Sequence, residues 1–321
     1  MTHAAVRSAR PPLWHYLPVL FTMAQRHLTG GGPYVFSFNI ADRCPIGCNC
    51  YWRAQARVPE LSDDEVVEFF QRRRDEGFVL ANIVGGEPYV RPKLLDRVAG
   101  ILPFNWLVTS GTTPLRRLWR TTHIISIDGA SAETHDRVRR SSGLYARIMR
   151  NLGRARSEGD FPAFIHTTLN AMNYREIGDI CALWKDNGLA DGILISTLTP
   201  IKGAGDDRLR LSLEQRVDIV DELLRLKKEH GDFLLQTEGM IRLLHPDHTA
   251  NLSPETCSAA QFVHSYDAAG NRIPQCILSE KADCRECGCV VTTLMSDRSR
   301  PTRVGSKIDM IALSARLSGL R

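Results

Sequence analysis

Residues 44–52 read Cys-Pro-Ile-Gly-Cys-Asn-Cys-Tyr-Trp, which places three thiols within seven positions of the chain. The run at 34–40, Tyr-Val-Phe-Ser-Phe-Asn-Ile, comes just before them and predicts a strand. The thiols therefore follow the carboxyl end of the first strand, which in α/β barrels is the face where chemistry is done. Three thiolates can hold three corners of a four-iron cluster and leave the fourth iron open. A zinc site and three unrelated thiols are the alternatives, because thiolates suit both metals.

Beyond this stretch, short apolar runs alternate with helical patterns. Further strands are predicted at 78–84, 105–109, 123–127, 163–169 and 192–196. Helices are predicted at about 62–77, 92–100, from 113 onward, and at about 143–157, 173–187 and 212–231. Ser62 and Glu65 fit a capping box at the start of the first of these helices. Six strand–helix units in alternation indicate parallel strands joined by right-handed crossovers.

The fold class predicted from this alternation is α/β, an open partial (β/α)6 TIM-like barrel with a small cysteine-rich C-terminal extension. Six units are too few to close a complete eight-fold barrel. The predicted domains are a lead-in helix over residues 1–33, the barrel over 34–236, and the cysteine-rich extension with a basic tail over 237–321. One helix is expected in the tail, near 307–319.

The nine cysteines are unevenly distributed, with three at 44–50, five at 257–289, and Cys181 alone in a helical pattern. Such clustering indicates metal binding instead of a disulfide framework, and a labile cluster favours a reducing, cytoplasmic location. Cys181 is interpreted as a buried apolar residue. The net charge of +5 is mild and no nucleic-acid motif is present, so no nucleic-acid partner is expected.

The N-terminal segment is basic and partly apolar. Residues 1–30 contain Arg7, Arg10 and Arg26 and no acid, and the apolar run 13–24 is too short to span a bilayer. A helix packed on the barrel is expected here. The alternative is an interfacial anchor that makes weak contact with a membrane surface.

Four motifs fall in a fixed order along the chain. They are the cysteines at 44–50, Gly85-Gly86-Glu87-Pro88, Thr-Ser-Gly-Thr at 109–112, and Ser126-Ile127-Asp128-Gly129 followed by His135 and Arg139. Together they resemble the radical S-adenosylmethionine (radical SAM) enzymes over about residues 34–200. The ordered set carries the resemblance, because Gly-Gly-Glu-Pro alone is a weak signal.

This resemblance implies a [4Fe-4S] cluster held by Cys44, Cys48 and Cys50, whose free iron binds the methionine end of S-adenosyl-L-methionine. It also implies a reductant such as flavodoxin or ferredoxin, and cleavage of the cofactor to a 5′-deoxyadenosyl radical that abstracts hydrogen. The chain departs from the family pattern in its spacing, C-x3-C-x-C instead of C-x3-C-x2-C, and its aromatic residue follows the third cysteine. Tyr51 or Trp52 is therefore expected beside the adenine.

The same resemblance implies that the Gly-Gly-Glu-Pro motif binds the methionine end of the cofactor. Gly85 and Gly86 would let backbone carbonyls approach the methionine ammonium, since a side chain there would block them. Glu87 would lie beside that ammonium. A simple turn is the alternative for the two glycines.

The motif after the fourth strand is expected at the other end of the cofactor. Ser126 and Asp128 are placed for the ribose hydroxyls or the carboxylate, and Arg139 is a candidate carboxylate partner. A solvated basic face is the alternative for Arg139, and a packing or capping role is the alternative for His135. Side chains at the ends of the next two strands face the same direction, namely Thr168, Asn170 and Ser196.

The second cysteine group comprises Cys257, Cys276, Cys284, Cys287 and Cys289, with the hairpin-like Asp-Ala-Ala-Gly-Asn at 267–271 after the first of them. This pattern resembles the auxiliary-cluster extension called SPASM, or twitch in its shortened form. It implies a second [4Fe-4S] cluster held by Cys257, Cys276, Cys284 and Cys287, with Cys289 in reserve. Zinc is the alternative.

The substrate expected from these features is a small molecule of secondary metabolism, such as a sugar, nucleoside or aminocyclitol. Peptide-modifying relatives commonly carry a separate leader-recognition domain, and the residues before the first strand are too few to form one. A peptide maturase, adenosyl transfer to a lipid alkene, and a non-catalytic Fe–S scaffold are the alternatives.

Overall fold

The computed structural model describes residues 33–48, 57–203 and 207–297, together with Leu17, Val19, Phe21, Thr22 and Ser314. The expected lead-in helix and the expected tail helix therefore lie almost wholly outside the described residues. Two of the described N-terminal side chains, Leu17 and Phe21, are exposed. Among the described helices, none is long and apolar enough to cross a membrane.

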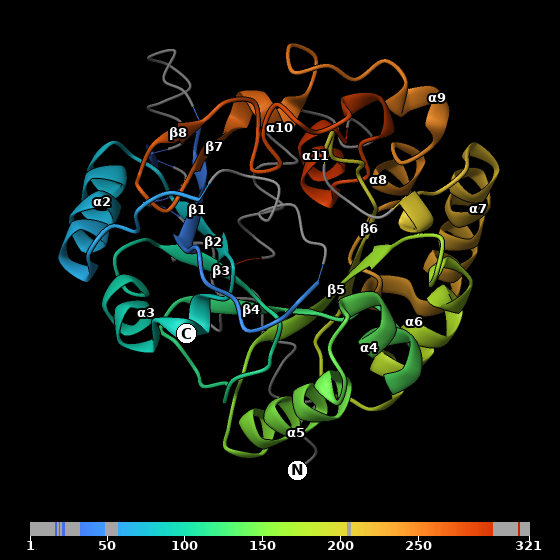
Figure 1. Cartoon of the computed structure of the whole chain (residues 1–321), viewed down its shortest axis with the longest axis horizontal. Helices are drawn as coiled ribbons and strands as arrows, with labels where there is room; N and C mark the ends of the chain where they lie inside the picture. Colours follow the sequence, from blue (N-terminus) through green and yellow to red (C-terminus); the bar gives the residue numbers. More distant parts are fainter. Residues whose placement is uncertain are drawn as a thin grey trace.

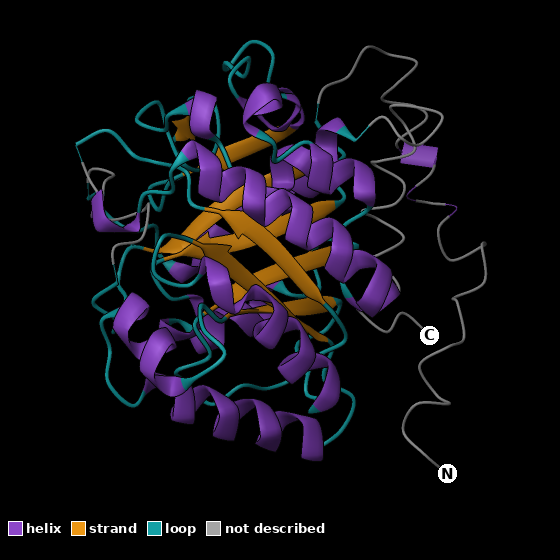
Figure 2. Ribbon diagram, turned by 90° about the vertical axis from the view of Figure 1, so that its right-hand side faces the viewer, coloured by secondary structure: helices purple, strands orange, loops and turns teal. Residues whose placement is uncertain are grey.

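The described strands form one curved sheet with the order β6-β5-β4-β3-β2-β1-β7-β8 (Figures 1 and 2). All neighbouring pairs are parallel except the last, in which β8 runs antiparallel to β7. The strands are β1 Val35–Ala41, β2 Leu80–Gly85, β3 Phe104–Thr109, β4 Thr121–Ser126, β5 Ala163–Leu169, β6 Ile193–Thr197, β7 Val263–Tyr266 and β8 Arg272–Ile273.

The longer helices cover the outside of this sheet, as Figures 1 and 2 show. They are α2 Asp63–Asp75, α3 Pro92–Val98, α4 Ala132–Arg139, α5 Leu144–Ser157, α6 Ile177–Asp186 and α7 Leu213–His230. Four short helices follow in the extension: α8 Glu238–Arg242, α9 Pro246–Thr249, α10 Ser258–Phe262 and α11 Val290–Ser296. Single 3-10 turns occur at η3 Pro88–Val90, η4 Tyr174–Glu176, η5 Asp207–Leu209, η6 Gly231–Phe233 and η7 Cys284–Glu286.

The predicted α/β partial barrel is confirmed, with its six parallel strands in sequence order. The capping box that opens α2 is also confirmed, since the Glu65 amide donates to the Ser62 hydroxyl and the Ser62 amide donates to the Glu65 carboxylate. The helix predicted from residue 113 onward is wrong. Asn151 of α5 donates to the carbonyls of Gly111 and Thr113, at 2.9 and 3.0 Å, and these bonds hold the segment as a loop.

The C-terminal extension fills the space between the two edges of the open barrel (Figure 1). Strand β7 pairs in parallel with β1, with Val263 opposite Val35. At the other edge, the Thr197 amide at the end of β6 donates to the Gly288 carbonyl at 3.0 Å. The hairpin expected around 267–271 is confirmed as the turn between β7 and β8. The extension thus adds strands to the barrel sheet, which the sequence did not predict.

Side chains on the two faces of the sheet form two apolar layers. Phe36, Phe38 and Ile40 of β1 point toward the helices, where the first two make aromatic contacts with Phe69 and Phe70 of α2. The opposite face lines the barrel interior with Trp106 of β3, Ile124 of β4, Phe164 of β5 and Leu194 of β6, among others. This inner layer forms the floor of the pocket described below.

A buried histidine in the outer layer makes stability depend on pH. Burial lowers the pKa of His123 to about 3 from 6.5, and its Nε2 lies 2.8 Å from the Tyr89 hydroxyl. The unfolded chain therefore binds a proton that the folded chain excludes, and stability falls as pH drops below about 6.5. We expect a loss of about 2 kcal/mol from this residue between pH 6.5 and 5.

Urea unfolding of the wild type and of His123→Gln at several pH values measures this effect. The glutamine variant takes up no proton at this position, so its unfolding free energy should depend less steeply on pH between 6.5 and 5. Equal slopes in the two proteins would show that His123 is not kept neutral by the fold.

Candidate active site

A pocket of about 640 Å³ occupies the barrel interior at the carboxyl ends of the strands. Its floor is apolar. Its walls carry polar side chains of β4, β5 and β6 and of the residues just after β4 and β5, namely Ser126, Asp128, His166, Thr168, Asn170 and Ser196. Two cysteines line it, Cys48 from the loop after β1 and Cys289 from the extension. The pocket therefore lies between the two cysteine groups.

The first cysteine loop lies directly against the Gly-Gly-Glu-Pro turn. The Gly86 amide donates to the Ala41 carbonyl at 2.8 Å, and the Glu87 amide donates to the Arg43 carbonyl at 2.9 Å. A Cβ on Gly85 would lie 2.5 Å from the Ala41 oxygen, and a Cβ on Gly86 would lie 2.2 Å from the Arg43 oxygen. Both positions require glycine because the two backbones touch.

Gly86→Ala is therefore expected to displace the segment that leads into the cysteines. We expect a loss of about 2–4 kcal/mol in unfolding free energy, in the range of other severe backbone clashes. Gly153→Ala is the matched control, since it lies within α5 and a Cβ there meets nothing within 4 Å. That change should stabilise the protein by up to about 1 kcal/mol. Equal effects of the two substitutions in urea unfolding would contradict the close contact.

Glu87 is fully buried, and its carboxylate accepts hydrogen bonds from its own chain. The donors are the Tyr89 amide, the Thr109 hydroxyl at 2.7 Å, and both the amide and the hydroxyl of Ser110. Glu87 is not among the described residues that line the pocket. The structure thus places this carboxylate as a link between the ends of β2 and β3.

Asp128 is the most connected carboxylate of the pocket. One of its oxygens accepts the Thr168 amide at 2.9 Å, and the other forms an ion pair of 2.6 Å with Nε of Arg139. Its own amide donates to Nδ1 of buried His135 at 3.0 Å. The structure therefore brings Asp128 and Arg139 together at the pocket wall. His135 fixes the loop that carries Asp128, which is the packing role considered for it.

His166 of β5 and Ser196 of β6 form a polar pair, in which Nε2 of His166 lies 2.9 Å from the Ser196 hydroxyl. The sequence analysis named Ser196 but did not name His166. Burial lowers the pKa of His166 to about 4, so the imidazole is neutral at pH 7. The Val290 amide of the extension donates to the same hydroxyl at 3.1 Å. Side chains alternate along a strand, so His166 points inward as Thr168 does. This alternation could have identified His166 from the sequence.

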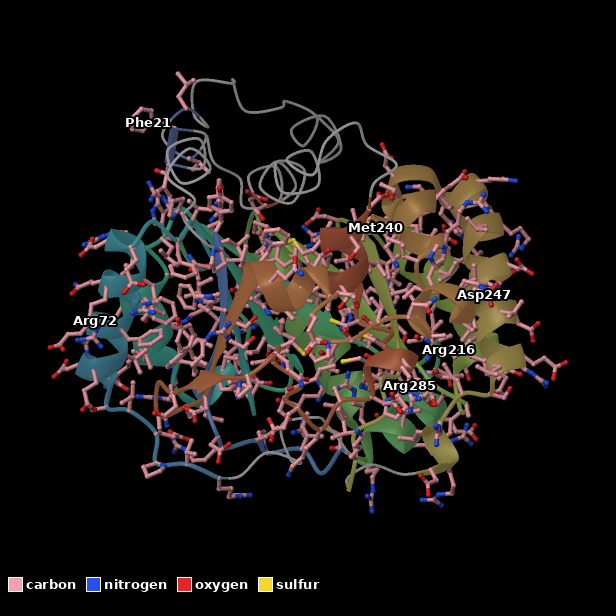
Figure 3. The ribbon with its side chains drawn as sticks, turned by 90° about the horizontal axis from the view of Figure 1, so that it is seen from above. Phe21, Arg72, Arg216, Met240, Asp247 and Arg285 are labelled. Atoms are coloured by element: carbon pink, nitrogen blue, oxygen red, sulfur yellow. The ribbon has the colours of Figure 1, made fainter. Side chains whose placement is uncertain are left out.

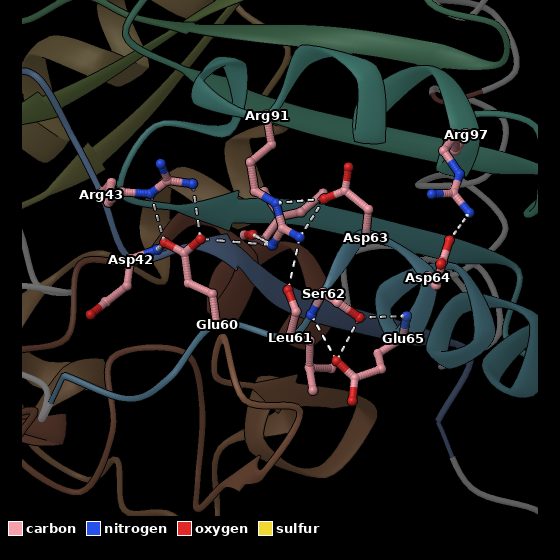
Figure 4. A network of polar contacts seen from close by, with 11 residues as sticks. Asp42, Arg43, Glu60, Leu61, Ser62, Asp63, Asp64, Glu65, Arg91 and Arg97 are labelled. Atoms are coloured by element: carbon pink, nitrogen blue, oxygen red, sulfur yellow. Dashed lines mark hydrogen bonds and ion pairs between the residues drawn. The ribbon is translucent and has the colours of Figure 1, made fainter.

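An ion-pair network clamps the base of the cysteine loop (Figure 4). Glu60 accepts the Asp42 amide at 2.9 Å and the guanidinium of Arg43 at 3.1 and 3.2 Å. Arg91, buried beneath them, donates to the carbonyls of Ile40 and Leu61 at 2.8 Å each. The network therefore ties the chain just before the cysteine loop to the chain just after it.

The second cysteine group surrounds a smaller cavity of about 50 Å³. All five members line it: Cys257, Cys276, Cys284, Cys287 and Cys289. Burial and the neighbouring thiols of Cys287, Cys257 and Cys284 raise the pKa of Cys276 to about 12. No group of three or more metal-ligating side chains in the described chain converges on a single ion position. The thiols instead surround a space, an arrangement that fits the separate corners of a cluster.

The segment between the last two cysteines is fixed tightly to β6. A Cβ on Gly288 would lie 1.9 Å from the Thr197 hydroxyl oxygen, so only glycine fits there. Arg216 of α7 donates to the Glu286 carbonyl at 2.7 Å from the other side. In Figure 3, seen from above, the labels of Arg216 and Arg285 lie over the same part of the molecule. These contacts hold Cys287 and Cys289 against the barrel.

Three sequence-predicted site residues, Cys50, Tyr51 and Trp52, lie outside the described residues. Cys44 and Cys48 are described, and Cys48 is nearly buried at 7% exposure. Of the predicted cofactor-binding stretch, the structure therefore describes two thiols and the glycine turn.

The sequence is similar to those of two kinds of known protein. The chain is 30% identical over 212 residues to the AdoMet-dependent heme synthase of Methanosarcina barkeri, a match that covers 61% of this chain and 59% of that protein. It is 28% identical over 255 residues to the mycofactocin maturase MftC of Mycobacterium ulcerans, covering 74% of this chain and 67% of the maturase. No protein-family model matches the sequence.

Solved structures share the fold. Streptococcus suis SuiB bound to precursor peptide SuiA superposes with a TM-score of 0.62 at 11% identity, covering 88% of this chain and 70% of that one. The enzyme anSMEcpe with bound AdoMet and a peptide gives 0.56 at 15% identity, covering 89% and 88%. The sequence relatives and the shared fold together support the radical SAM superfamily that the ordered motifs suggested, and the chain spans about three fifths of the length of the heme synthase. Members of this superfamily bind S-adenosyl-L-methionine and a [4Fe-4S] cluster, and SPASM-type members carry additional clusters.

Proposed function

We propose that this protein cleaves S-adenosyl-L-methionine and removes a hydrogen atom from a peptide substrate. The observation that carries the proposal is the pocket that opens between Cys48 and Cys289 at the carboxyl ends of the barrel strands. Support for a peptide comes from the maturase MftC and from two structures of the same fold that contain peptides. These findings favour the peptide alternative over the small molecule expected from the sequence.

In this proposal Cys44, Cys48 and Cys50 hold the [4Fe-4S] cluster, beside the Gly85-Gly86 turn. The bound cluster and cofactor supply a 5′-deoxyadenosyl radical, with an electron from a flavodoxin- or ferredoxin-like reductant. The Asp128 carboxylate, fixed by Arg139 and the Thr168 amide, accepts the ribose hydroxyls. Tyr51 provides the surface for the adenine.

The protein's own contribution is orientation and exclusion of water. The apolar floor formed by Trp106, Ile124 and Phe164 keeps solvent from the reacting carbon. Neutral His166 and the Ser196 hydroxyl present a polar pair to the substrate without adding charge. Residues 237–321 form the auxiliary extension, in which Cys257, Cys276, Cys284 and Cys287 hold a second cluster.

A small-molecule substrate is the second candidate. The 30% identity to a heme synthase favours it, because that name denotes a product that is not a peptide. A panel of candidate substrates, incubated anaerobically with the iron-loaded protein and cofactor, separates the two. Release of 5′-deoxyadenosine that rises with a peptide supports the first candidate, and a rise only with tetrapyrroles or other small molecules supports the second.

Iron content tests the assignment of the two cysteine groups. We expect about eight irons per reconstituted chain, and about four in Cys284→Ala, because each cluster contributes four. The variant should still cleave the cofactor, as its change lies in the extension, but should fail to complete turnover of substrate. Four irons together with zinc in the wild type would assign the extension to zinc instead.

A further inference from the structure

Cys289 differs from the other four cysteines of the extension in what its side chain faces. Cys257, Cys276, Cys284 and Cys287 line the small cavity, whereas Cys289 lines both that cavity and the large barrel pocket. The two spaces share a wall that also includes Asn82, Ile277, Leu278 and Val291. Cys289 is therefore the thiol of this group that a molecule in the barrel pocket can touch.

The other four thiols of the extension lie close to one another. After burial, the causes that raise the pKa of Cys276 include the thiols of Cys287, Cys257 and Cys284, and those that raise the pKa of Cys284 include Cys287 and Cys257. Cys257 also raises the pKa of Cys287. Each of these four thus lies within range of the other three, as the corners of one cluster require. Cys289 adjoins this set through Cys287 and Cys276.

The backbone around Cys289 fixes its position against the barrel. The Gly288 amide donates to the Thr199 hydroxyl at 2.9 Å, and the Val290 amide donates to the Ser196 hydroxyl at 3.1 Å. Cys289 is thus held between two bonds, one to Ser196 of β6 and one to Thr199 just after that strand. Its thiol shares the lining of the pocket with His166 and Ser196.

We propose that Cys289 is not a cluster ligand but the hydrogen-atom donor of the active site, which delivers its Sγ hydrogen to a carbon radical in the barrel pocket. This inference rests on the proposed function. An S–H bond is weaker than a C–H bond, so the transfer from sulfur to an alkyl radical is downhill. The S–H bond breaks, a C–H bond forms, and a thiyl radical remains on Cys289.

The thiol is then restored by one electron and one proton. The electron comes from the same class of one-electron reductant that the first step requires, and the proton comes from solvent. The substrate carbon regains the hydrogen that it lost, so the net change at that carbon is not an oxidation. The reaction class that follows is inversion or another redox-neutral rearrangement at a C–H carbon of the substrate.

The test uses S-adenosyl-L-methionine alone as the probe. The iron-loaded full chain is incubated with this cofactor and dithionite in D₂O, where thiols exchange to S–D and C–H bonds of the protein do not. The 5′-deoxyadenosine is analysed by mass spectrometry. In the wild type, most of it should carry one deuterium, because Cys289 quenches the radical in the pocket.

In Cys289→Ser the deuterated fraction should fall at least several-fold, since an O–H bond is too strong to donate its hydrogen atom. Cys181→Ala is the matched control, because Cys181 is a buried residue of α6 outside both cysteine groups. Its deuterated fraction should equal that of the wild type.

Iron content, which does not depend on turnover, is measured alongside. Cys289→Ser should retain the wild-type iron content. Loss of about four irons, or an unchanged deuterated fraction in Cys289→Ser, would overturn the inference. If the wild type forms no 5′-deoxyadenosine at all, the proposed function fails and the donor role falls with it.

Discussion

Cys48→Ala is expected to lower the formation of 5′-deoxyadenosine at least about a hundredfold, to the level of iron-free protein. Cys48 is nearly buried and lines the barrel pocket, and the first cysteine group contains only three thiols. Removal of one leaves two thiolates for a cluster that needs three. A single lost ligand therefore removes the cofactor-binding centre, whereas a changed pocket residue would only weaken it.

This result is measured by chromatography of anaerobic reactions with dithionite, together with iron content. Cys181→Ala is the control, because Cys181 is fully buried in α6 and its change removes a thiol away from both cysteine groups. That variant should keep the wild-type iron content and yield. Undiminished 5′-deoxyadenosine from Cys48→Ala would refute the assignment of the first group.

Arg91→Met is expected to destabilise the protein by about 3 kcal/mol and to lower its iron content. The guanidinium is 8% exposed, and it donates to the carbonyls of Ile40 and Leu61 and to the Asp63 carboxylate at 2.6 Å. Methionine fills a similar space but leaves two carbonyls without their charged donor, and hydrogen bonds to charged groups contribute about 1.5–3 kcal/mol each. The cysteine loop loses its anchor at both ends.

Arg97→Met provides the matched comparison. Arg97 forms an ion pair of 2.6 Å with Asp64, but both side chains are exposed, at 43% and 82%. Such pairs contribute about 0–1 kcal/mol, so this variant should unfold in urea almost as the wild type does and bind the same amount of iron. If the two variants prove equally stable, the network of Figure 4 does not hold the loop in place.

Local patterns in the sequence predicted much of the fold. The six barrel strands and the capping box at Ser62 could be recognised because each depends on residues within one or two turns of chain. The pairing of β7 with β1 could not be predicted this way, since it depends on a contact between distant segments. The loop after Gly111 was misread for the same reason, because Asn151 overrides its helical signal.

In the candidate site, too, the motif residues could be predicted from the sequence, and the contacts between distant segments could not. Cys48, Asp128 and Arg139 were identified from motifs, and the structure brings all three to one pocket. The buried carboxylate of Glu87 and the partnership of His166 with Ser196 depend on which side chains meet across strands. Cys289 lines two cavities at once, and the spacing of the cysteines in the sequence does not predict this.

The pairing of β7 with β1 also affects how the chain folds during synthesis. Strand β1 emerges before β7, so one of its edges lacks this partner until residues 263–266 have been made. An uncovered edge can pair with other chains, and contacts between distant segments form slowly. The first cysteine loop follows that strand, so iron delivered before β7 docks would meet an incompletely fixed site. We therefore expect late cluster insertion, and expression at low temperature with slow translation should improve the yield of iron-loaded protein.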